Sequence, residues 1–302
     1  MTKKIAVIND LSGFGRCSLT AAISVISAMG IQACPLPTAI LTAQTGYPHY
    51  YLDDYTDKMD IYRQEWQKMG QHFDGIYTGF VASEAQIDQI FHFIDTFYTS
   101  DTFLLVDPVM GDDGIKYDMF TPKLLEKMNA LVGEADIITP NLTELCLLTD
   151  ADYDAIIDIA DTRILIDVIG ELVSTLLPPD SDNSNTLDSR QTSKKEKEII
   201  VTGIHCKNEH GQKMMGNLYV SKDTRKLFAF PHVGGSYSGT GDLFASCIAA
   251  GKCRGDGIPE LIQLAGTFLE QAIKDSAEEN VPYPDGTNYE KYLYMLIKKI
   301  ES

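Results

Sequence analysis

The chain has 302 residues, of which 44% are hydrophobic, so it is long enough to bury a large core. Its 43 acidic residues against 25 basic ones give a formal net charge of −18 at pH 7. This charge disfavours nucleic acid and anionic membranes, and we expect neither as a partner. A polyanionic substrate would need backbone amides or a metal ion to reduce the repulsion.

Six cysteines are scattered along the chain without the spacing of a metal site or a redox motif. No segment has the pattern of a signal peptide or of an 18-residue apolar membrane span. We therefore expect a cytoplasmic protein with reduced thiols.

Apolar runs typical of buried strands alternate with segments of helical spacing. Residues 4–8 form the first predicted strand and 19–29 the first predicted helix, with a turn at 9–16 between them. The later predicted elements are strand Gly75–Thr78, helix 84–98, strand Phe103–Val106, helix 122–132, strand Ile137–Ile138, a helix from Thr143, strand 199–202, an extended segment 229–233 and helices 242–250 and 259–276. This alternation predicts a mostly parallel sheet with helices on both faces.

Polar residues follow several of the predicted strands. They are Asn9 and Asp10, Asp107, Thr139 and Asn141, and Thr202. Because ligands of such sheets bind beyond the carboxyl ends of the strands, we expect these residues to meet at one site.

Residues 178–198 contain almost no large apolar side chain, so burial cannot offset the entropy lost on ordering them. We predict a mobile surface insertion. Because 199–202 has the pattern of another strand of the same sheet, the favoured interpretation is a single domain over 1–302.

The segment 234–246, GGSYSGTGDLFAS, combines a glycine-broken turn, an aspartate and a helix start. Gly239 and Gly241 allow successive N–H groups to point into one concavity, which the positive end of the helix would make attractive to an anion. Asp242 in the same turn could accept the proton of a substrate hydroxyl, which suits phosphoryl transfer. Its other interpretation, as a helix N-cap, is equally compatible with the spacing.

Seven motifs occur in an order that identifies a family. They are LSGFGRCSLTAA from residue 11, AQTGYPHY at 43–50, TGF at 78–80, VDPVMGDDG at 106–114, ITPNLTEL at 138–145, IVTG at 200–203 and GTGDLFAS at 239–246. The chain resembles the ribokinase-like superfamily and, within it, the vitamin B6 kinases, which phosphorylate pyridoxal, pyridoxine and pyridoxamine. The resemblance covers most of the chain and implies a three-layer α/β fold and a B6 salvage activity.

By this resemblance, Asp242 is the general base for the substrate hydroxymethyl group and also contacts the substrate, while Gly239, Thr240 and Gly241 form the anion hole. The base and anion hole agree with the interpretation of the glycine turn reached from the residues alone.

The resemblance also implies a nucleotide and metal site. Asn141 and Glu144 correspond to the pair that orders the ATP phosphates and the water shell of Mg²⁺, with Asp112 as a second carboxylate. Asp107, Thr139 and Thr202 correspond to a site for K⁺ or Na⁺, and the nucleotide-binding set is Asp112, Tyr117, Asn141, Glu144, Thr202 and Thr240, with Tyr117 in a lid over ATP. Glu144 could instead be a first-turn acid that complements its helix dipole.

On the substrate side, Ser12 and Thr45 match hydroxyls that hold the substituents of the pyridine ring, and Phe80 lies near the ring. Tyr47 and His49 belong to a flap over it. Family members are commonly homodimers, so a homodimer is expected.

Three other functions remain open. A hydroxymethylpyrimidine kinase of thiamin synthesis shares SGFG at 12–15 and LTAQT at 41–45, but that group usually carries GTGC where this chain has GTGD. A nucleoside or sugar kinase would need an early β-sheet lid, for which 31–37 leaves little room. An ATP-binding regulator without catalysis is disfavoured by the presence of Asp242, Glu144 and Asn141.

Overall fold

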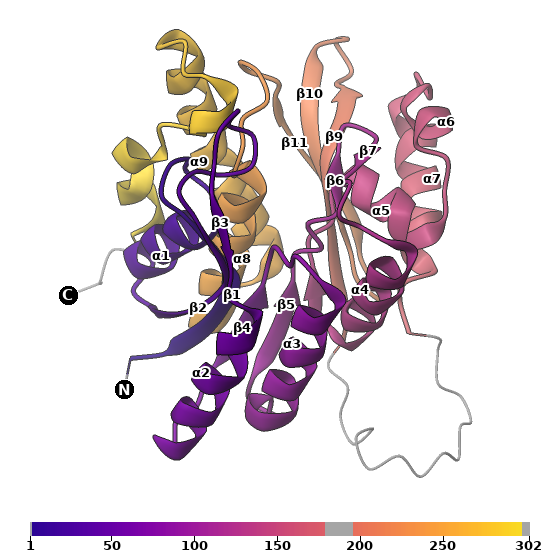
Figure 1. The fold of residues 1–302 in the computed structure, drawn as a ribbon. Helices are drawn as coiled ribbons and strands as arrows, with labels where there is room; N and C mark the ends of the chain where they lie inside the picture. The colour runs from indigo at the N-terminus through magenta and orange to yellow at the C-terminus, as the bar shows by residue number, and fades with distance from the viewer. Residues whose placement is uncertain (1, 179–195, 298–302) are drawn as a thin grey trace, which may run out of the picture.

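The computed structural model describes residues 2–178 and 196–297. Its centre is a nine-stranded sheet in the order β11-β10-β9-β8-β5-β4-β1-β2-β3, flanked on both sides by helices (Figure 1). The strands are β1 Lys4–Ser12, β2 Gln32–Leu41, β3 Leu52–Asp54, β4 Gly75–Thr78, β5 Phe103–Val106, β8 Ile137–Ile138, β9 Glu198–Lys207, β10 Lys213–Val220 and β11 Arg225–Pro231.

Pairing in the sheet is parallel from β2 through β1, β4, β5 and β8 to β9, and antiparallel where β3 joins β2 and where β10 joins β9 and β11. A separate hairpin consists of β6 Gly111–Asp112 and β7 Ile115–Lys116. The helices are α1 Ser18–Ala28, α2 Thr56–Lys68, α3 Glu84–Phe97, α4 Pro122–Glu134, α5 Leu142–Thr149, α6 Tyr153–Ile157, α7 Thr162–Ser174, α8 Thr240–Arg254 and α9 Ile258–Glu278, followed by the 3-10 helices η1 Tyr283–Asp285 and η2 Tyr289–Leu296.

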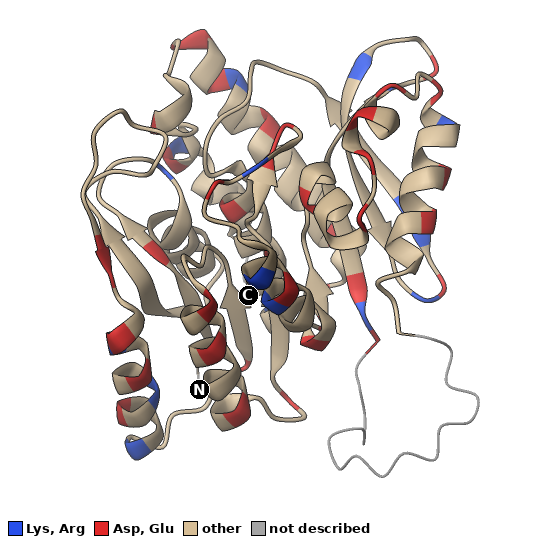
Figure 2. Ribbon diagram, turned by 45° about the vertical axis from the view of Figure 1, so that its right-hand side comes forward, with Lys and Arg blue, Asp and Glu red and all other residues tan. Residues whose placement is uncertain are grey.

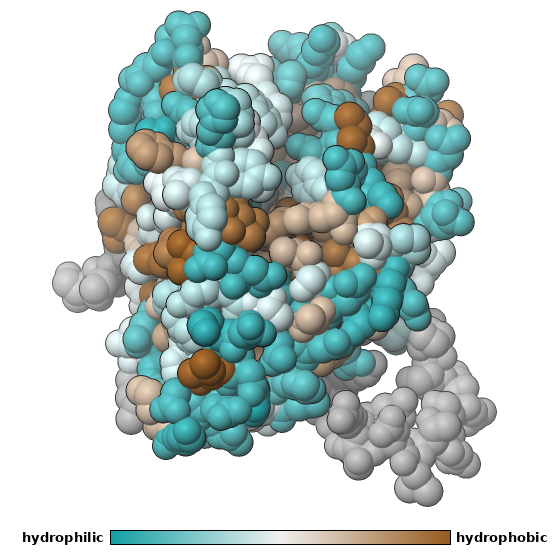
Figure 3. Space-filling view, in the orientation of Figure 1, coloured by the Kyte–Doolittle hydropathy of each residue, from teal (hydrophilic) through white to brown (hydrophobic). Residues whose placement is uncertain are grey.

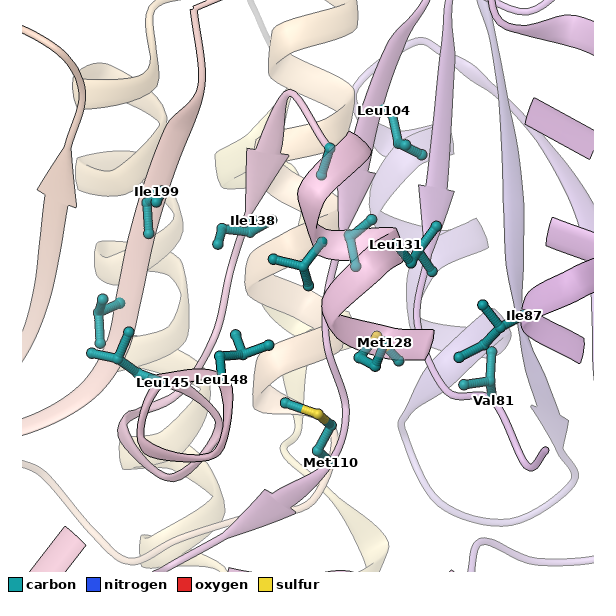
Figure 4. Close-up of a cluster of buried hydrophobic side chains, with 14 of the residues drawn as sticks. Val81, Ile87, Leu104, Met110, Met128, Leu131, Ile138, Leu145, Leu148 and Ile199 are labelled. Atoms are coloured by element: carbon teal, nitrogen blue, oxygen red, sulfur yellow. The ribbon is translucent and has the colours of Figure 1, made fainter. Parts of the chain in front are cut away.

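Alternating side chains give the sheet two buried faces. In β1, Ile5 and Val7 belong to one core, whereas Ala6 and Ile8 belong to the other. Helices α1, α8 and α9 cover the first face, and α2 to α7 cover the second. Figure 4 shows part of the second core, in which Leu131 of α4 lies among strand residues such as Leu104 and Ile138. The predicted three-layer α/β fold with a mostly parallel sheet is confirmed.

Two predicted boundaries at the site are wrong. Strand β1 continues to Ser12 instead of turning at residue 9, because polar partners satisfy the side chains of Asn9 and Asp10 inside the fold. Helix α8 begins at Thr240 rather than at Asp242, which places Asp242 within its first turn. The antiparallel strands β3 and β10 were not predicted.

Most of the predicted insertion at 178–198 lies outside the described residues. Its predicted end is wrong, since Glu198 begins β9 and Lys197 is buried. The ammonium group of Lys197 donates to the carbonyl of Val132 near the end of α4, which ties this residue to that helix. The single domain over 1–302 stays a prediction.

Asp and Glu residues are spread over many helices and loops and visibly outnumber Lys and Arg (Figure 2). The face in Figure 3 is largely hydrophilic, with small groups of hydrophobic residues near its middle. Within 2–178 and 196–297, no helix has both the length and the apolar character required to cross a membrane.

Candidate active site

A cleft of about 660 Å³ opens at the carboxyl ends of the parallel strands, where the N-terminus of α8 also arrives. Its volume is in the range of small-molecule sites. The lining residues that the sequence singled out as site residues are Thr45, Phe80, Asp107, Asp112, Tyr117, Thr139, Asn141, Glu144, Thr202, Gly239, Thr240, Gly241 and Asp242. The expected convergence of strand ends on one site is therefore present, although Asn9, Ser12, Tyr47 and His49 are absent from this lining.

Gly239 shapes the entrance to α8. Its φ of +82° lies in the left-handed region, and a Cβ atom there would come within 2.1 Å of the carbonyl oxygen of Arg16. Glycine is therefore required both by the backbone conformation and by the close approach of the loop before α1. Gly239 is also the N-cap of α8 and makes no side-chain cap, and the first residues of the helix, Thr240 and Gly241, line the cleft.

Asp242 does not cap its own helix. One carboxylate oxygen accepts a 3.0 Å hydrogen bond from Asn9 Nδ2, and the other accepts a 2.8 Å bond from the backbone N–H of Ser18, the first residue of α1. Burial, and to a smaller extent the charge of Asp10, raise the pKa of Asp242 to about 6, opposed by the donated hydrogen bonds. A carboxylate held in one orientation, with a pKa near neutrality, has the properties of a general base.

Asn9 connects three segments at the site. Its side chain is fully buried and, besides donating to Asp242, accepts 2.9 Å hydrogen bonds from the backbone N–H groups of Asp10 and Phe80. This residue therefore ties the end of β1 to the segment after β4 and to α8. Its place after a predicted strand was visible in the sequence, whereas its contact with a residue 233 positions away was not.

A second carboxylate lies near the glycine turn. Asp107 follows β5, and its Oδ1 accepts a 2.8 Å hydrogen bond from the hydroxyl of Thr139. A Cβ atom on Gly241 would lie 4.0 Å from Asp107 Oδ2, so this carboxylate borders the turn. Burial and the charge of Asp242 raise the pKa of Asp107 to about 7, since the single hydroxyl donor only partly offsets them.

Asn141 and Glu144 form a capping box at the start of α5. Each side chain accepts a 2.8 Å hydrogen bond from the backbone N–H of the other, and Glu144 Oε1 also accepts from the N–H of Met110 at 3.1 Å. Asn141 Nδ2 donates to the carbonyl of Gly111 at 2.8 Å, which anchors the β6–β7 hairpin. Glu144 is thus both a capping residue and a lining residue. Burial and the charge of Asp107 raise the pKa of Glu144 well above its usual range.

The hairpin brings two predicted nucleotide residues to the cleft. Asp112 is the last residue of β6, and desolvation of its carboxyl group together with the neighbouring charge of Asp113 raises its pKa. Tyr117 follows β7 and is 39% exposed. A 2.8 Å hydrogen bond from the N–H of Gly114 to the hydroxyl of Thr143 attaches the hairpin to α5.

On the substrate side, several predicted residues lie outside the lining of the cleft. Ser12 is fully buried and does not line the cleft, because its hydroxyl donates a 2.8 Å hydrogen bond to Oδ2 of Asp10, which does line it. Tyr47 and His49 are also absent from the lining, and the hydroxyl of Tyr47 donates to Asp285 at 2.6 Å. Lining residues that the sequence analysis left without a role include Asp10, Gln44, Tyr50, Tyr237 and Tyr283.

The charged residues in the described lining of the cleft are all acidic. Its acidic lining residues are Asp10, Asp107, Asp112, Asp118, Glu144 and Asp242, and none of the described lining residues is Lys or Arg. A polyphosphate could not enter such a cleft as a bare anion, so the donor set fits one or more cations that arrive with it. Within the described residues no three His, Cys, Asp or Glu side chains cluster closely enough to hold a metal by themselves, so phosphate oxygens would have to complete the coordination.

Comparison with known proteins shows a match to one family model and a similarity to several kinases. The family model described as phosphomethylpyrimidine kinase matches residues 15–176 and 171–283. A "putative phosphomethylpyrimidine kinase" from Bacteroides thetaiotaomicron, in a crystal form with pyridoxal, is 33% identical with a TM-score of 0.83, over 100% of this chain and 98% of that one. Pyridoxal kinase from Lactobacillus plantarum is 25% identical with a TM-score of 0.81, over 98% of this chain and 97% of that one.

Among curated proteins, a "putative pyridoxal kinase" of Schizosaccharomyces pombe is 28% identical over 194 residues, which are 63% of this chain and 50% of the relative. The aligned part thus spans about half the length of that relative.

Proposed function

Because the chain belongs to the phosphomethylpyrimidine kinase family, we propose that it is the kinase that transfers the γ-phosphoryl group of ATP to the 5'-hydroxymethyl group of a B6 vitamer. The observation that carries this proposal is Asp242, held by two donors beside the N-terminus of α8 in a cleft of small-molecule size.

In the proposed reaction, Asp242 accepts the proton of the hydroxymethyl group as its oxygen forms the new bond to the γ-phosphorus. The bond from that phosphorus to the bridging oxygen of ATP breaks, and ADP leaves with its electron pair. We propose that the N–H groups of the turn at Gly239, Thr240 and Gly241, which line the cleft, stabilise the negative charge on the transferred group.

We propose that Mg²⁺ enters with ATP and is held, partly through water, by Asp112 and Glu144. It would supply the positive charge that the lining lacks. Asp107, Thr139 and Thr202 are the proposed neighbours of a K⁺ or Na⁺ ion, and Asn141, Thr202 and Thr240 the proposed further nucleotide contacts. Tyr117 would close over the nucleotide and exclude water.

A B6 vitamer is favoured as the acceptor over hydroxymethylpyrimidine by two relatives. The Bacteroides protein was crystallised with pyridoxal, and the Lactobacillus protein is a pyridoxal kinase. Thr45 and Phe80, the proposed acceptor contacts, both line the cleft. Hydroxymethylpyrimidine remains the second candidate, because the matching family model is that of a phosphomethylpyrimidine kinase.

The decisive experiment is a kinase assay with ATP and Mg²⁺ in which pyridoxal, pyridoxine, pyridoxamine and hydroxymethylpyrimidine compete side by side. We expect phosphorylation of at least one vitamer with a higher kcat/KM than that of hydroxymethylpyrimidine. Phosphorylation of hydroxymethylpyrimidine alone would replace the proposed substrate, and ATP binding without transfer to any acceptor would favour a regulator.

We further propose that 1–302 is one kinase domain, since a single sheet contains both β1 and β11. The homodimer expected from the resemblance also remains a proposal. Light scattering would test the homodimer by giving the mass in solution.

A further inference from the structure

Asp10 is a lining residue that the proposed phosphoryl transfer does not use. It lies near the end of β1, with only 6% of its surface exposed, and it faces the same cleft as Asp242. The transfer needs one base, an anion hole and cations for the phosphates, and Asp242, α8 and the residues near α5 are already assigned to these tasks. These tasks therefore do not explain why Asp10, a further buried acid, lines the cleft.

The partners of Asp10 are hydroxyl groups. Ser12 donates to Oδ2 at 2.8 Å, and the hydroxyl of Ser18 also hydrogen-bonds the carboxyl group. Asp10 takes part in none of the ion pairs found among the described residues, and no Lys or Arg of the described chain lines the cleft. A buried carboxylate without an opposite charge is costly, so this side chain is suited to a ligand that supplies a positive N–H group.

Asp10 and Asp242 are held at a fixed spacing by two shared neighbours. Asn9 accepts from the N–H of Asp10 and donates to Asp242, while Ser18 donates its hydroxyl to Asp10 and its backbone N–H to Asp242. Ser18 thus hydrogen-bonds both carboxyl groups, and both aspartates line the cleft. A ligand that contacts both must be short, and it must carry an N–H donor for one carboxylate and a hydroxyl for the other.

We propose that Asp10 is a specificity-determining residue that accepts a hydrogen bond from the protonated ring nitrogen of the acceptor, while Asp242 faces its hydroxymethyl group. This inference rests on the proposed function. A pyridine ring meets the requirement because its nitrogen gains a proton beside a carboxylate and lies only a few bonds from the hydroxymethyl oxygen. Asp10 thus takes the place on the substrate side that the sequence analysis gave to Ser12, and Ser12 orients it.

The test compares two ligands on two proteins. One ligand is pyridoxine and the other is its analogue in which C–H replaces the ring nitrogen, and the proteins are the wild type and Asp10→Asn. Calorimetry without ATP gives the dissociation constants, and kinase assays give kcat/KM. Because a hydrogen bond to a charged group is strong, the wild type should favour pyridoxine by roughly 10- to 100-fold, and Asp10→Asn should reduce this preference to about 3-fold or less.

Asp118→Asn is the matched control, since it removes the same charge from another lining residue. In that variant the two ligands should shift together and the preference should persist. A thermal melt of each variant reports folding. If Asp10→Asn does not fold, the wild-type preference decides, since a wild type that binds the two ligands equally overturns the proposal.

Equal losses for both ligands in Asp10→Asn would show a merely structural role and overturn the proposal. Failure of the proposed function would give a different result from failure of the role of Asp10. A wild type that phosphorylates hydroxymethylpyrimidine but no vitamer would overturn the proposed function and this inference together, whereas equal phosphorylation of pyridoxine and its analogue would overturn only the role of Asp10.

Discussion

Asp242 combines burial with two hydrogen-bond donors, and the balance between these effects gives its carboxyl group a pKa of about 6. Without the donors from Asn9 and Ser18 the pKa would be higher, because burial disfavours the charged form. The donors also fix the direction in which the carboxylate can accept a proton. A single side chain thus obtains both its ionisation state and its orientation from Asn9 of β1 and Ser18 of α1.

Asp242→Asn should lower kcat by ~10²–10⁴, because it removes the base and keeps nearly the same shape. ATP affinity, measured by calorimetry, should change little, since amides and cations are the proposed partners of the phosphates. Asp57→Asn on the exposed side of α2 is the control for the loss of one negative charge. Turnover close to that of the wild type would remove Asp242 from the role of base.

At the scale of elements, two helix N-termini meet at the cleft. The loop before α1 passes so close to the N-cap of α8 that only a glycine hydrogen atom fits between Gly239 and Arg16, and the first N–H of α1 binds Asp242 of α8. The glycine turn and Asp242, the proposed anion hole and base, are therefore held by contact between two elements, and a change at either N-terminus should affect both.

Gly239→Ala should reduce both stability and turnover. The new Cβ would collide with the carbonyl of Arg16 in a backbone conformation unfavourable for alanine, with a cost of about 1–3 kcal/mol. Gly235→Ala is the matched control in the same loop, because a Cβ there meets nothing within 4 Å. Chemical denaturation and steady-state kinetics would check this, and equal behaviour of the two variants would contradict it.

The start of α5 supports a second prediction at this scale. Glu144→Ala leaves the N–H groups of Asn141 and Met110 without their acceptor, so the free energy of unfolding should fall by about 1–3 kcal/mol. It should also raise the Mg²⁺ concentration for half-maximal rate, because a proposed ligand is lost. Thr121→Ala removes the N-cap of α4 away from the cleft and should lower stability alone. An unchanged Mg²⁺ dependence in Glu144→Ala would reduce Glu144 to a capping residue.

For the whole molecule, the dominant property is an excess of negative charge that is also concentrated in the cleft. The net charge of −18 repels a polyanion at long range, and the buried lining carboxylates repel one another at short range. The cation proposed to enter with ATP would therefore reduce the repulsion between the lining carboxylates as well as neutralise the phosphates.

Because of Asp107, the unliganded protein should become less stable as pH rises from 3.8 to about 7. Its pKa is raised from 3.8 to about 7 on folding, so the folded state holds this proton more tightly than the unfolded state. The resulting stabilisation is full below the unfolded pKa and is lost as pH rises to the folded one. Asp107→Asn should therefore gain stability relative to the wild type above pH 7, and the difference should shrink toward pH 5. Parallel pH–stability curves from denaturant titrations would disprove this.

Much of the architecture was determined by the sequence itself. Strands Gly75–Thr78, Phe103–Val106 and Ile137–Ile138 were predicted with their observed bounds, because short apolar runs between helical segments can be buried on both faces only inside a parallel sheet. The same pattern predicted that polar residues at the strand ends meet, and Asp107, Thr139 and Thr202 do line one cleft.

Other features were decided only by the tertiary structure. The sequence offers Asp10 and Ser12 as equally polar neighbours, and the fold alone decides that Asp10 faces the cleft while Ser12 is buried behind it. In the same way, the spacing of GTGD allows Asp242 to be a cap or a base, and contacts with Asn9 and Ser18 more than 220 positions away exclude the cap. The pattern of apolar and polar residues within a segment reflects which faces of that element are exposed. The direction and the pKa of a side chain depend instead on atoms that only folding brings near it.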